Sequence, residues 1–362
     1  MSTSSRKLDR IRICLNQKVE TTGRPFEDIV LLHRALPEID EVDIDTTCRF
    51  LGKELAAPLM ICAMTGGHPA TKEINLRLGQ AASETGIAIG VGSQRAALED
   101  RALEETFSVV RDAAPDVPVI GNIGAVQLKR SGPEIIEKLA EMIDADAIAI
   151  HLNFLQESIQ PEGDRDGAGV LDAIKSAAKG PVPIMVKETG AGISREVASD
   201  LVSAGVKMID VSGTGGLSWA GVEAFRAAET KDDDLEEMGR LMESWGIPTP
   251  ASIVECRSAG AYVISSGGIR SGLDVARSLA LGAGLAGASL PFLRPASEGR
   301  DEVVRTARSY IRALRTAMFL TGSEDLRQLG LAPLVVLGRT REWLEARGFD
   351  MNKFSIYREL SR

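Results

Sequence analysis

Residues 147–165 read AIAIHLNFLQESIQPEGDR, and this stretch contains the pattern that decides the fold. Its first four residues form a short apolar run, which is typical of a strand buried on both faces. The polar segment from His151 to Arg165 therefore leaves the end of a buried strand. A simple connection needs only turn residues, so an imidazole, amides and several charged groups at this point indicate a binding site. We expect a polar, anionic ligand there, with a carboxylate available for a metal ion.

The same pattern repeats along the chain from about residue 55 onward. Short apolar runs that do not strictly alternate are each followed by an amphipathic helical stretch. Roughly eight such units over some 250 residues predict a (β/α)8 TIM barrel. An open doubly wound sheet is the alternative, but no GxGxxG sequence opens a helix after the first run. The predicted strands are Pro58–Met64, Ile87–Val91, Val117–Ile120, Ala147–Ile150, Val182–Val186, Met208–Val211, Tyr262–Ser265 and Gly284–Ala288.

Two segments lie outside this repeat. Residues 1–50 are expected to form an N-terminal extension ahead of a barrel of residues 51–362. Within the extension, Arg6–Leu15 fits a short helix, and the alternation over Asp40–Phe50 predicts a hairpin or a cap over the barrel base. The connection over Gly215–Pro250, after the sixth strand, is long for a barrel. It is either a solvated insertion or a lid over the site.

The composition restricts the class of function. A net charge of −9 disfavours a general binder of nucleic-acid backbones, and 4% aromatic residues offer little base-stacking surface. The four cysteines form no CxxC pair, which argues against a disulfide framework or a zinc site and fits a reducing cytoplasm. No apolar run reaches membrane-spanning length, and the N-terminus lacks the apolar region of a signal peptide. We therefore expect a cytoplasmic enzyme with no nucleic-acid or membrane partner.

Polar and glycine residues follow every predicted strand. Chemistry in a (β/α)8 barrel lies at the C-terminal ends of the strands, so these residues are expected to share one site. Any single segment could be a turn, but all of them together favour a binding function. The segments are MTGG at 64–67, GSQR at 92–95, GNIG at 121–124, HLN at 151–153, KETG at 187–190, SGTGG at 212–216, SGGIR at 266–270 and Ser289.

The last two strand ends have the composition of a phosphate site. SSGGIRSG at 265–272 and GAGLAGAS at 282–289 place glycines before helix starts, and barrels commonly bind phosphate after strands seven and eight. Such a phosphate usually belongs to a cofactor, frequently FMN. Lys187, at the fifth strand end, is then either a Schiff-base lysine or a cation beside the N1–O2 edge of the flavin. The phosphate turns favour the second interpretation.

These motifs together resemble those of the type 2 isopentenyl-diphosphate Δ-isomerases. The resemblance extends from residue 6 to about residue 340, and the string over 151–165 is its most specific part. The chain departs from the family at Arg10, where the family often has His. The matching motifs are Arg6-Lys7, AMTGG at 63–67, GSQR at 92–95, GN at 121–122, HLNxxQExxxPEGDR at 151–165, VKE at 186–188, SGTGG at 212–216 and SGGIR at 266–270.

The resemblance implies an enzyme of isoprenoid biosynthesis that interconverts isopentenyl and dimethylallyl diphosphate. Such an enzyme needs FMN, NADPH or NADH, and Mg²⁺, although the net reaction transfers no electrons. Reduced flavin is the implied acid and base that moves the double bond by one carbon. The reaction also requires that water is kept from a carbocation-like centre, and that cations and a metal hold the diphosphate.

The resemblance also implies roles for individual residues. Glu157 is the expected Mg²⁺ ligand, and Gln156, His151 and Lys187 are the expected catalytic residues. The expected substrate contacts are Arg6, Lys7, Ser93, Arg95, His151 and Gln156. The expected flavin contacts are Ala63, Met64, Thr65, Ser93, Asn122, Lys187, Ser212, Thr214, Gly267, Gly268, Arg270, Ala288 and Ser289. By residue type alone, His151 could instead be a satisfied strand-end histidine, Glu157 and Lys187 ordinary surface charges, and Ala63 and Met64 core residues.

Two other functions stay open from the sequence. An FMN-dependent 2-hydroxy-acid oxidoreductase would share the barrel and the phosphate turns, but it needs a histidine base near the seventh strand, and no histidine follows residue 151. A non-catalytic flavin-binding sensor would have no use for Glu157 beside Gln156. We also expect a homo-oligomer, in which Arg6 and Lys7 could reach a neighbouring subunit's site. The choice between NADH and NADPH, and the flavin atoms that transfer each proton, stay open.

Overall fold

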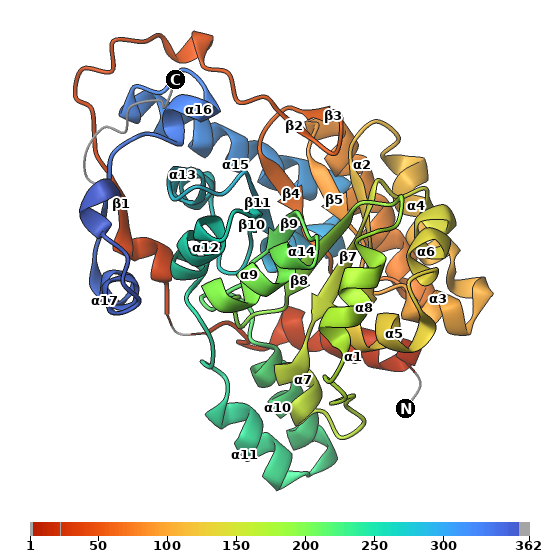
Figure 1. The fold of residues 1–362 in the computed structure, drawn as a ribbon. Helices are drawn as coiled ribbons and strands as arrows, with labels where there is room; N and C mark the ends of the chain where they lie inside the picture. The colour runs from red at the N-terminus through yellow and green to blue at the C-terminus, as the bar shows by residue number, and fades with distance from the viewer. Residues whose placement is uncertain (1–2, 22, 355–362) are drawn as a thin grey trace.

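The chain folds into a closed barrel of eight parallel strands, which confirms the predicted fold class (Figure 1). The structure is a computed structural model that describes residues 3–21 and 23–354, with side chains from residue 7 onward. Each predicted strand has its counterpart, and neighbours in the barrel follow chain order. The barrel strands are β4 (Leu59–Ile61), β5 (Ala88–Gly90), β6 (Val119–Gly124), β7 (Ala147–Leu152), β8 (Ile184–Glu188), β9 (Met208–Asp210), β10 (Tyr262–Ser265) and β11 (Leu285–Ala288).

The strands are buried on both faces, which explains why their apolar runs do not alternate. Side chains that point inward form a separate buried cluster, to which β7 contributes Ala149 and β8 contributes Met185. Because side chains alternate along a strand, His151 and Lys187 point inward two residues later, toward the C-terminal mouth. The register pairs His151 with Lys187 and Lys187 with Asp210. Three ionisable side chains from adjacent strands therefore lie next to one another in the barrel.

Helices surround the barrel, and their ends follow the sequence signals. The hydroxyl of Ser271 accepts the backbone N–H of Asp274, as expected for a helix N-cap, and Ser194 accepts that of Val197 in the same way. The helices that follow successive strands are α2 (Lys72–Thr85), α3 (Arg95–Glu99), α4 (Glu105–Ala113), α5 (Ala125–Ser131), α6 (Ile135–Ile143), α7 (Phe154–Ile159), α8 (Val170–Ala177), α9 (Arg195–Ser203), α12 (Thr249–Ser258), α13 (Gly272–Ala280), α14 (Leu290–Glu298), α15 (Arg300–Thr321), α16 (Leu326–Leu329) and α17 (Gly338–Ala346). No helix in the described part of the chain is long and apolar enough to cross a membrane.

The N-terminal extension packs on both ends of the barrel. Its helix α1 (Thr3–Asn16) contains the predicted helical stretch, and β1 (Ile29–Leu31) pairs with β12 (Leu334–Val336) near the C-terminus. Strands β2 (Cys48–Phe50) and β3 (Lys53–Leu55) form a hairpin whose apolar side chains join the inner barrel cluster. A hairpin therefore does cap the barrel base, but it spans residues 48–55 rather than the predicted 40–50, where Glu41–Asp43 form a 3-10 turn. The expected boundary at residue 50 falls inside this hairpin, because the two strands pair across that position.

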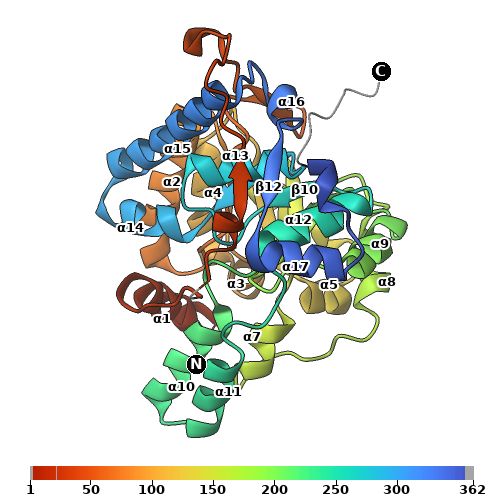
Figure 2. The same ribbon diagram turned by 90° about the vertical axis from the view of Figure 1, so that its left-hand side faces the viewer.

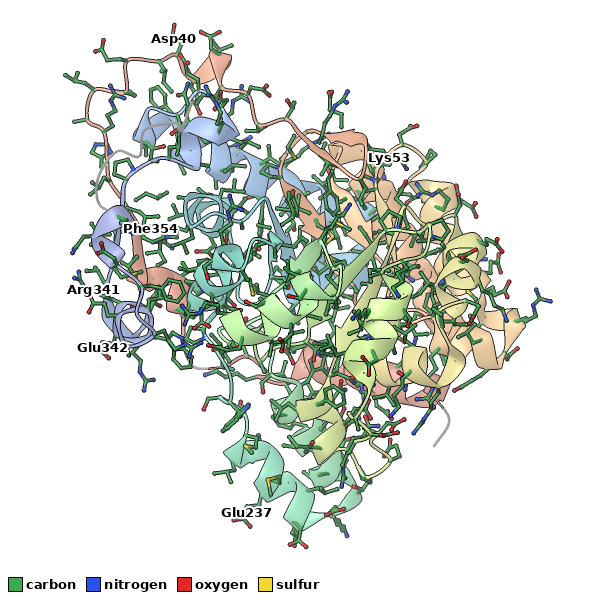
Figure 3. The ribbon with its side chains drawn as sticks, viewed as in Figure 1. Asp40, Lys53, Glu237, Arg341, Glu342 and Phe354 are labelled. Atoms are coloured by element: carbon green, nitrogen blue, oxygen red, sulfur yellow. The ribbon has the colours of Figure 1, made fainter. Side chains whose placement is uncertain are left out.

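The long connection after the sixth barrel strand is helical rather than an open loop. It contains α10 (Trp219–Thr230) and α11 (Asp233–Leu241), which project from the barrel on the side of α1 and α7 (Figures 1 and 2). Figure 3 places Glu237 of α11 and Lys53 of the base hairpin at opposite ends of the molecule. The insertion therefore belongs to the end of the barrel where the strands terminate.

We predict that Gly272→Ala destabilises the fold, because α13 begins in direct contact with α15. A Cβ atom at residue 272 would lie 1.9 Å from the backbone oxygen of Tyr310 and 2.5 Å from the backbone nitrogen of Leu314. Such overpacking against backbone should lower the free energy of unfolding by about 3 kcal/mol in urea titrations. Gly299→Ala is the control, since a Cβ there meets nothing within 4 Å. Equal stability of the two variants would contradict the helix packing described above.

Candidate active site

A cavity of about 640 Å³ opens at the C-terminal mouth of the barrel. Its walls come from the ends of the barrel strands and from α1, α7 and α10. Seventeen of the residues predicted from the sequence line it: Lys7, Ala63, Met64, Thr65, Ser93, Arg95, Asn122, His151, Gln156, Glu157, Lys187, Ser212, Gly267, Gly268, Arg270, Ala288 and Ser289.

Two predicted residues are absent from this set. The side chain of Arg6 lies outside the described residues, although its backbone belongs to α1. Thr214 is outside the cavity lining, and its methyl group lies beside Gly246. Its backbone N–H donates to Ile247 and its carbonyl accepts from Thr249, at 2.9 and 3.2 Å. These bonds tie the loop after β9 to the start of α12.

The inner wall of the cavity is polar and tightly connected. The His151 Nδ1 atom is 2.7 Å from Asn122 Oδ1, and Lys187 Nζ donates to the carbonyl of Glu188 at 2.8 Å. Burial, together with the positive charges of Lys187, Lys7 and Arg10, lowers the pKa of His151 to about 3. In this state His151 is neutral, donates from Nδ1 to Asn122 and keeps Nε2 as an acceptor.

We predict a specific loss of stability on acidification that depends on His151. Because its folded pKa of about 3 lies below its unfolded value of 6.5, the unfolded chain takes up the proton first and stability falls as pH drops from 6.5 toward 3. Between pH 6.5 and about pH 5 the loss should approach 2 kcal/mol. Urea unfolding of the FMN-free protein and of His151→Gln at both pH values measures it. The variant should lose less stability than the parent, and an identical loss would refute the assignment.

Glu157 lies in the cavity with both carboxylate oxygens fixed by neighbours. Its Oε1 atom accepts from Asn153 Nδ2 and its Oε2 atom from the backbone N–H of Asp164, each at 2.7 Å. Both bonds come from the HLNFLQESIQPEGDR segment, which folds back on itself around α7. Among the described residues, no group of three or more His, Cys, Asp and Glu side chains could hold a metal. A metal at Glu157 must therefore take most of its ligands from the substrate and water.

Helix α1 supplies two cations to the cavity lining, Lys7 and Arg10. Lys7 Nζ donates to the carbonyl oxygens of Ser93, at 2.8 Å, and Gly66. Burial and the nearby charge of Arg10 lower the pKa of Lys7 to about 7. Arg95 also lines the cavity and is held by Glu99 at 2.9 Å.

Several residues that the sequence did not reveal complete the site. Glu223 of α10 is 2% exposed and accepts from Arg10 and from Gln156 Nε2, the latter at 2.9 Å. Glu20 holds Arg270 at 2.6 Å, so the chain after α1 lies against the loop that follows β10. Trp219 lines the cavity beneath Arg10. The helical spacing of WAGVEAF at 219–225 was the available signal for α10.

The wall near β10 and β11 fits a phosphate-bearing flavin. Gly267 and Gly268 have φ angles of +91° and +81°, and a Cβ at Gly267 would lie 2.3 Å from the backbone oxygen of Gly213. Only glycine therefore fits this turn. Thr65 lines the cavity, and its buried hydroxyl has no hydrogen-bond partner among the described residues. Ser289 precedes α14 without capping it, so its hydroxyl is also available to a ligand.

Known proteins match this chain over nearly its full length. An isopentenyl-diphosphate delta-isomerase of Methanothrix thermoacetophila is 60% identical over 358 residues, which are 99% of this chain and 100% of that protein. The chain belongs to the isopentenyl-diphosphate delta-isomerase family. Another member, from Methanosarcina mazei, is 51% identical over 98% of both chains. The family described as FMN-dependent dehydrogenase matches residues 16–113 and 136–335.

Solved structures of lower identity share the barrel. A mandelate oxidase with bound 3,3-difluoro-2-hydroxy-3-phenylpropionic acid superposes with a TM-score of 0.61 at 20% identity, over 90% of this chain and 94% of that one. This likeness shows the fold. The isomerase family membership follows from the sequence relatives and agrees with the resemblance of the HLNFLQESIQPEGDR segment.

Proposed function

We propose that this protein isomerises isopentenyl diphosphate to dimethylallyl diphosphate in isoprenoid biosynthesis, with reduced FMN as the acid and base. One observation carries the proposal: the cations of α1, the carboxylate of Glu157 and the flavin-fitting wall line one cavity. Membership of the isomerase family supports the same conclusion. A diphosphate held at one side would place its five-carbon chain against the flavin at the other.

The residues proposed to hold FMN line the cavity at the ends of β4, β8, β10 and β11. Gly267, Gly268 and Ser289 would receive the phosphate through backbone N–H and hydroxyl donors, and Arg270 adds a positive charge. Thr65, with its unpartnered hydroxyl, would donate to or accept from the ring system. When bound and reduced by NADPH or NADH, FMN supplies the proton donor and acceptor for the shift of the double bond. Lys187 is proposed to balance the negative charge of the reduced ring.

The diphosphate is proposed to bind between Lys7, Arg95, Ser93 and His151. Arg95 can make two parallel hydrogen bonds to phosphate, whereas Lys7 would contribute a point charge once the bound anion favours its protonated form. His151 can donate to a phosphate oxygen only after its Nε2 gains a proton, which the nearby anion would favour. Glu157 would hold Mg²⁺, which would offset the negative charge of the diphosphate, while Arg6 stays a prediction as a further contact.

Gln156 is proposed to orient the substrate beside the flavin. Its amide nitrogen is committed to Glu223, so its carbonyl oxygen faces Asn153 at 3.3 Å. Helix α1 and Trp219 of α10 cover this part of the cavity and would keep water from a carbocation-like centre. In this proposal, the long connection after β9 serves as a cover for the site, together with the N-terminal extension.

The two alternatives have weaker support. A 2-hydroxy-acid oxidoreductase would need a histidine base in the cavity near β10, and among the cavity-lining residues the histidine is His151 on β7. A flavin-binding sensor would not need Glu157 and the cations of α1 in the same cavity as the flavin site. A homo-oligomer and a cytoplasmic location stay predictions from the resemblance and the composition.

The purified protein tests the proposal directly. An FMN absorption spectrum, and anaerobic formation of dimethylallyl diphosphate that requires both a reductant and Mg²⁺, are the expected results. Omitting NAD(P)H, Mg²⁺ or FMN in turn shows which component is needed. A colourless protein that binds no added flavin would contradict the proposal, as would oxidation of lactate or glycolate in place of isomerisation.

A further inference from the structure

Arg10 occupies a different position in the site from the other cations. Its guanidinium donates to Glu223 Oε1 from Nε at 3.1 Å and from Nη2 at 2.8 Å, and Nη2 also donates to Gln160. It also lies over the ring of Trp219, 5.6 Å from the ring centroid. Arg10 thus connects α1 to α10 and to the C-terminal end of α7, and its Nε and Nη2 atoms donate to protein acceptors.

Glu223 is the centre of this group of contacts. Its side chain is 1% exposed, so its charge depends on partners within the protein. Arg226 pairs with the second carboxylate oxygen and extends to Glu162 at 3.3 Å. Arg10 and Gln156 share the first oxygen. The carboxylate of Glu223 is paired with two guanidinium groups, those of Arg10 and Arg226. Without Arg10, Arg226 alone would pair with it.

The contact with Glu223 determines which way the amide of Gln156 faces. Its nitrogen donates to Glu223 Oε1 at 2.9 Å, and its oxygen accepts from Asn153 Nδ2 at 3.3 Å. A flipped amide would put two oxygens together at Glu223 and two nitrogens together at Asn153. The orientation therefore requires that Glu223 stays in place and charged.

We propose that Arg10 is a positioning residue, which acts through Glu223 to fix the amide of Gln156 beside the reacting carbons. The proposal rests on the proposed function, because Gln156 must act on the substrate. It implies that Gln156 is aligned only when α1 lies over the cavity with Arg10 against Glu223. Figures 1 and 2 both show α1 next to α10, which agrees with this coupling.

Arg12 provides a matched control on the same helix. Its guanidinium donates to Glu229 of α10 at 2.6 Å, so it too joins α1 to α10. Unlike Arg10, it is half exposed and does not line the cavity. If Arg10 merely attached α1 to α10, then Arg10→Gln and Arg12→Gln would have similar effects.

The test compares kcat and KM for isopentenyl diphosphate in FMN-loaded parent, Arg10→Gln, Arg10→Lys and Arg12→Gln. We expect Arg10→Gln to lower kcat roughly 10- to 100-fold with KM and FMN affinity changed less than about threefold, since ground-state binding is untouched. Arg10→Lys should recover most of the loss, because it keeps the charge beside Glu223. Arg12→Gln should retain the parent kcat, and melting temperatures check that each variant is folded.

A double-mutant cycle with Gln156→Ala decides the route of the effect. If Arg10 acts through Gln156, adding Arg10→Gln to the Gln156→Ala protein should lower kcat by less than about twofold. The inference would be overturned if Arg10→Gln lowered kcat as much in the Gln156→Ala protein as in the parent, or if Arg12→Gln lowered kcat as much as Arg10→Gln. Either result would leave the proposed function intact. A parent protein that binds FMN but does not isomerise would instead overturn the proposed function, and this inference with it.

Discussion

Glu157→Gln is expected to reduce the Mg²⁺-dependent kcat roughly 100- to 1,000-fold, because it removes the carboxylate that is proposed to bind Mg²⁺. The substitution also disturbs the local bonds. An amide nitrogen would replace one of the two oxygens that accept from Asn153 and Asp164. The FMN affinity should stay within about twofold, since Glu157 is proposed to act on the diphosphate and is not among the residues proposed to hold FMN.

Anaerobic initial rates over a range of Mg²⁺ concentrations measure this effect, with flavin content read from the absorption spectrum. Asp166→Asn is the control, because its carboxylate pairs with Lys129 and is absent from the cavity lining. It should behave like the parent. Unchanged activity and Mg²⁺ dependence in Glu157→Gln would remove the metal assignment.

Lys187→Ala is expected to weaken FMN binding at least about 10-fold and to abolish most activity, since a buried cation is lost from the flavin wall. Lys187 is 9% exposed and pairs in register with Asp210, whose side chain is fully buried. Burial raises the pKa of Asp210, and the charge of Lys187 opposes that rise. Without Lys187, the positive charge that faces Asp210, and that is proposed to face the anionic reduced flavin, would be lost.

Equilibrium titration with FMN and the spectrum of the photoreduced protein measure the two effects separately. The reduced variant should show the neutral rather than the anionic flavin form. Lys187→Met keeps more of the side-chain volume and distinguishes loss of charge from loss of packing. Lys175→Ala on the exposed face of α8 is the control. An unchanged affinity together with an unchanged reduced spectrum would contradict the proposed role of Lys187.

The barrel was predictable because each of its units carries its own local signal. An apolar run such as Ala147–Ile150 identifies a strand, and the polar residues after it identify the functional end. The base hairpin was harder to place. Its turn lies at Leu51 and Gly52, which both have positive φ, and a leucine is an unusual residue for that conformation. The predicted range of 40–50 therefore stopped before the second strand.

The rest of the site depends on contacts between segments far apart in the chain. Glu223 reaches Arg10 across 213 positions, and Glu20 reaches Arg270 across 250. Neither carboxylate follows a barrel strand, so the rule that located the other residues could not find them. Thr214 shows that the same rule can also select a residue outside the site. It belongs to the SGTGG segment after a barrel strand, but its backbone is bonded to Ile247 and Thr249 and it lies outside the cavity lining.

Turnover of isopentenyl diphosphate in D₂O by the photoreduced, FMN-loaded protein tests the central claim most directly. If the chain's cavity aligns the alkene with a reduced flavin that serves as acid and base, dimethylallyl diphosphate should form with solvent deuterium in its new methyl group, while the flavin absorption stays that of the reduced form. Flavin reoxidation in step with product, or product free of deuterium, would contradict the account.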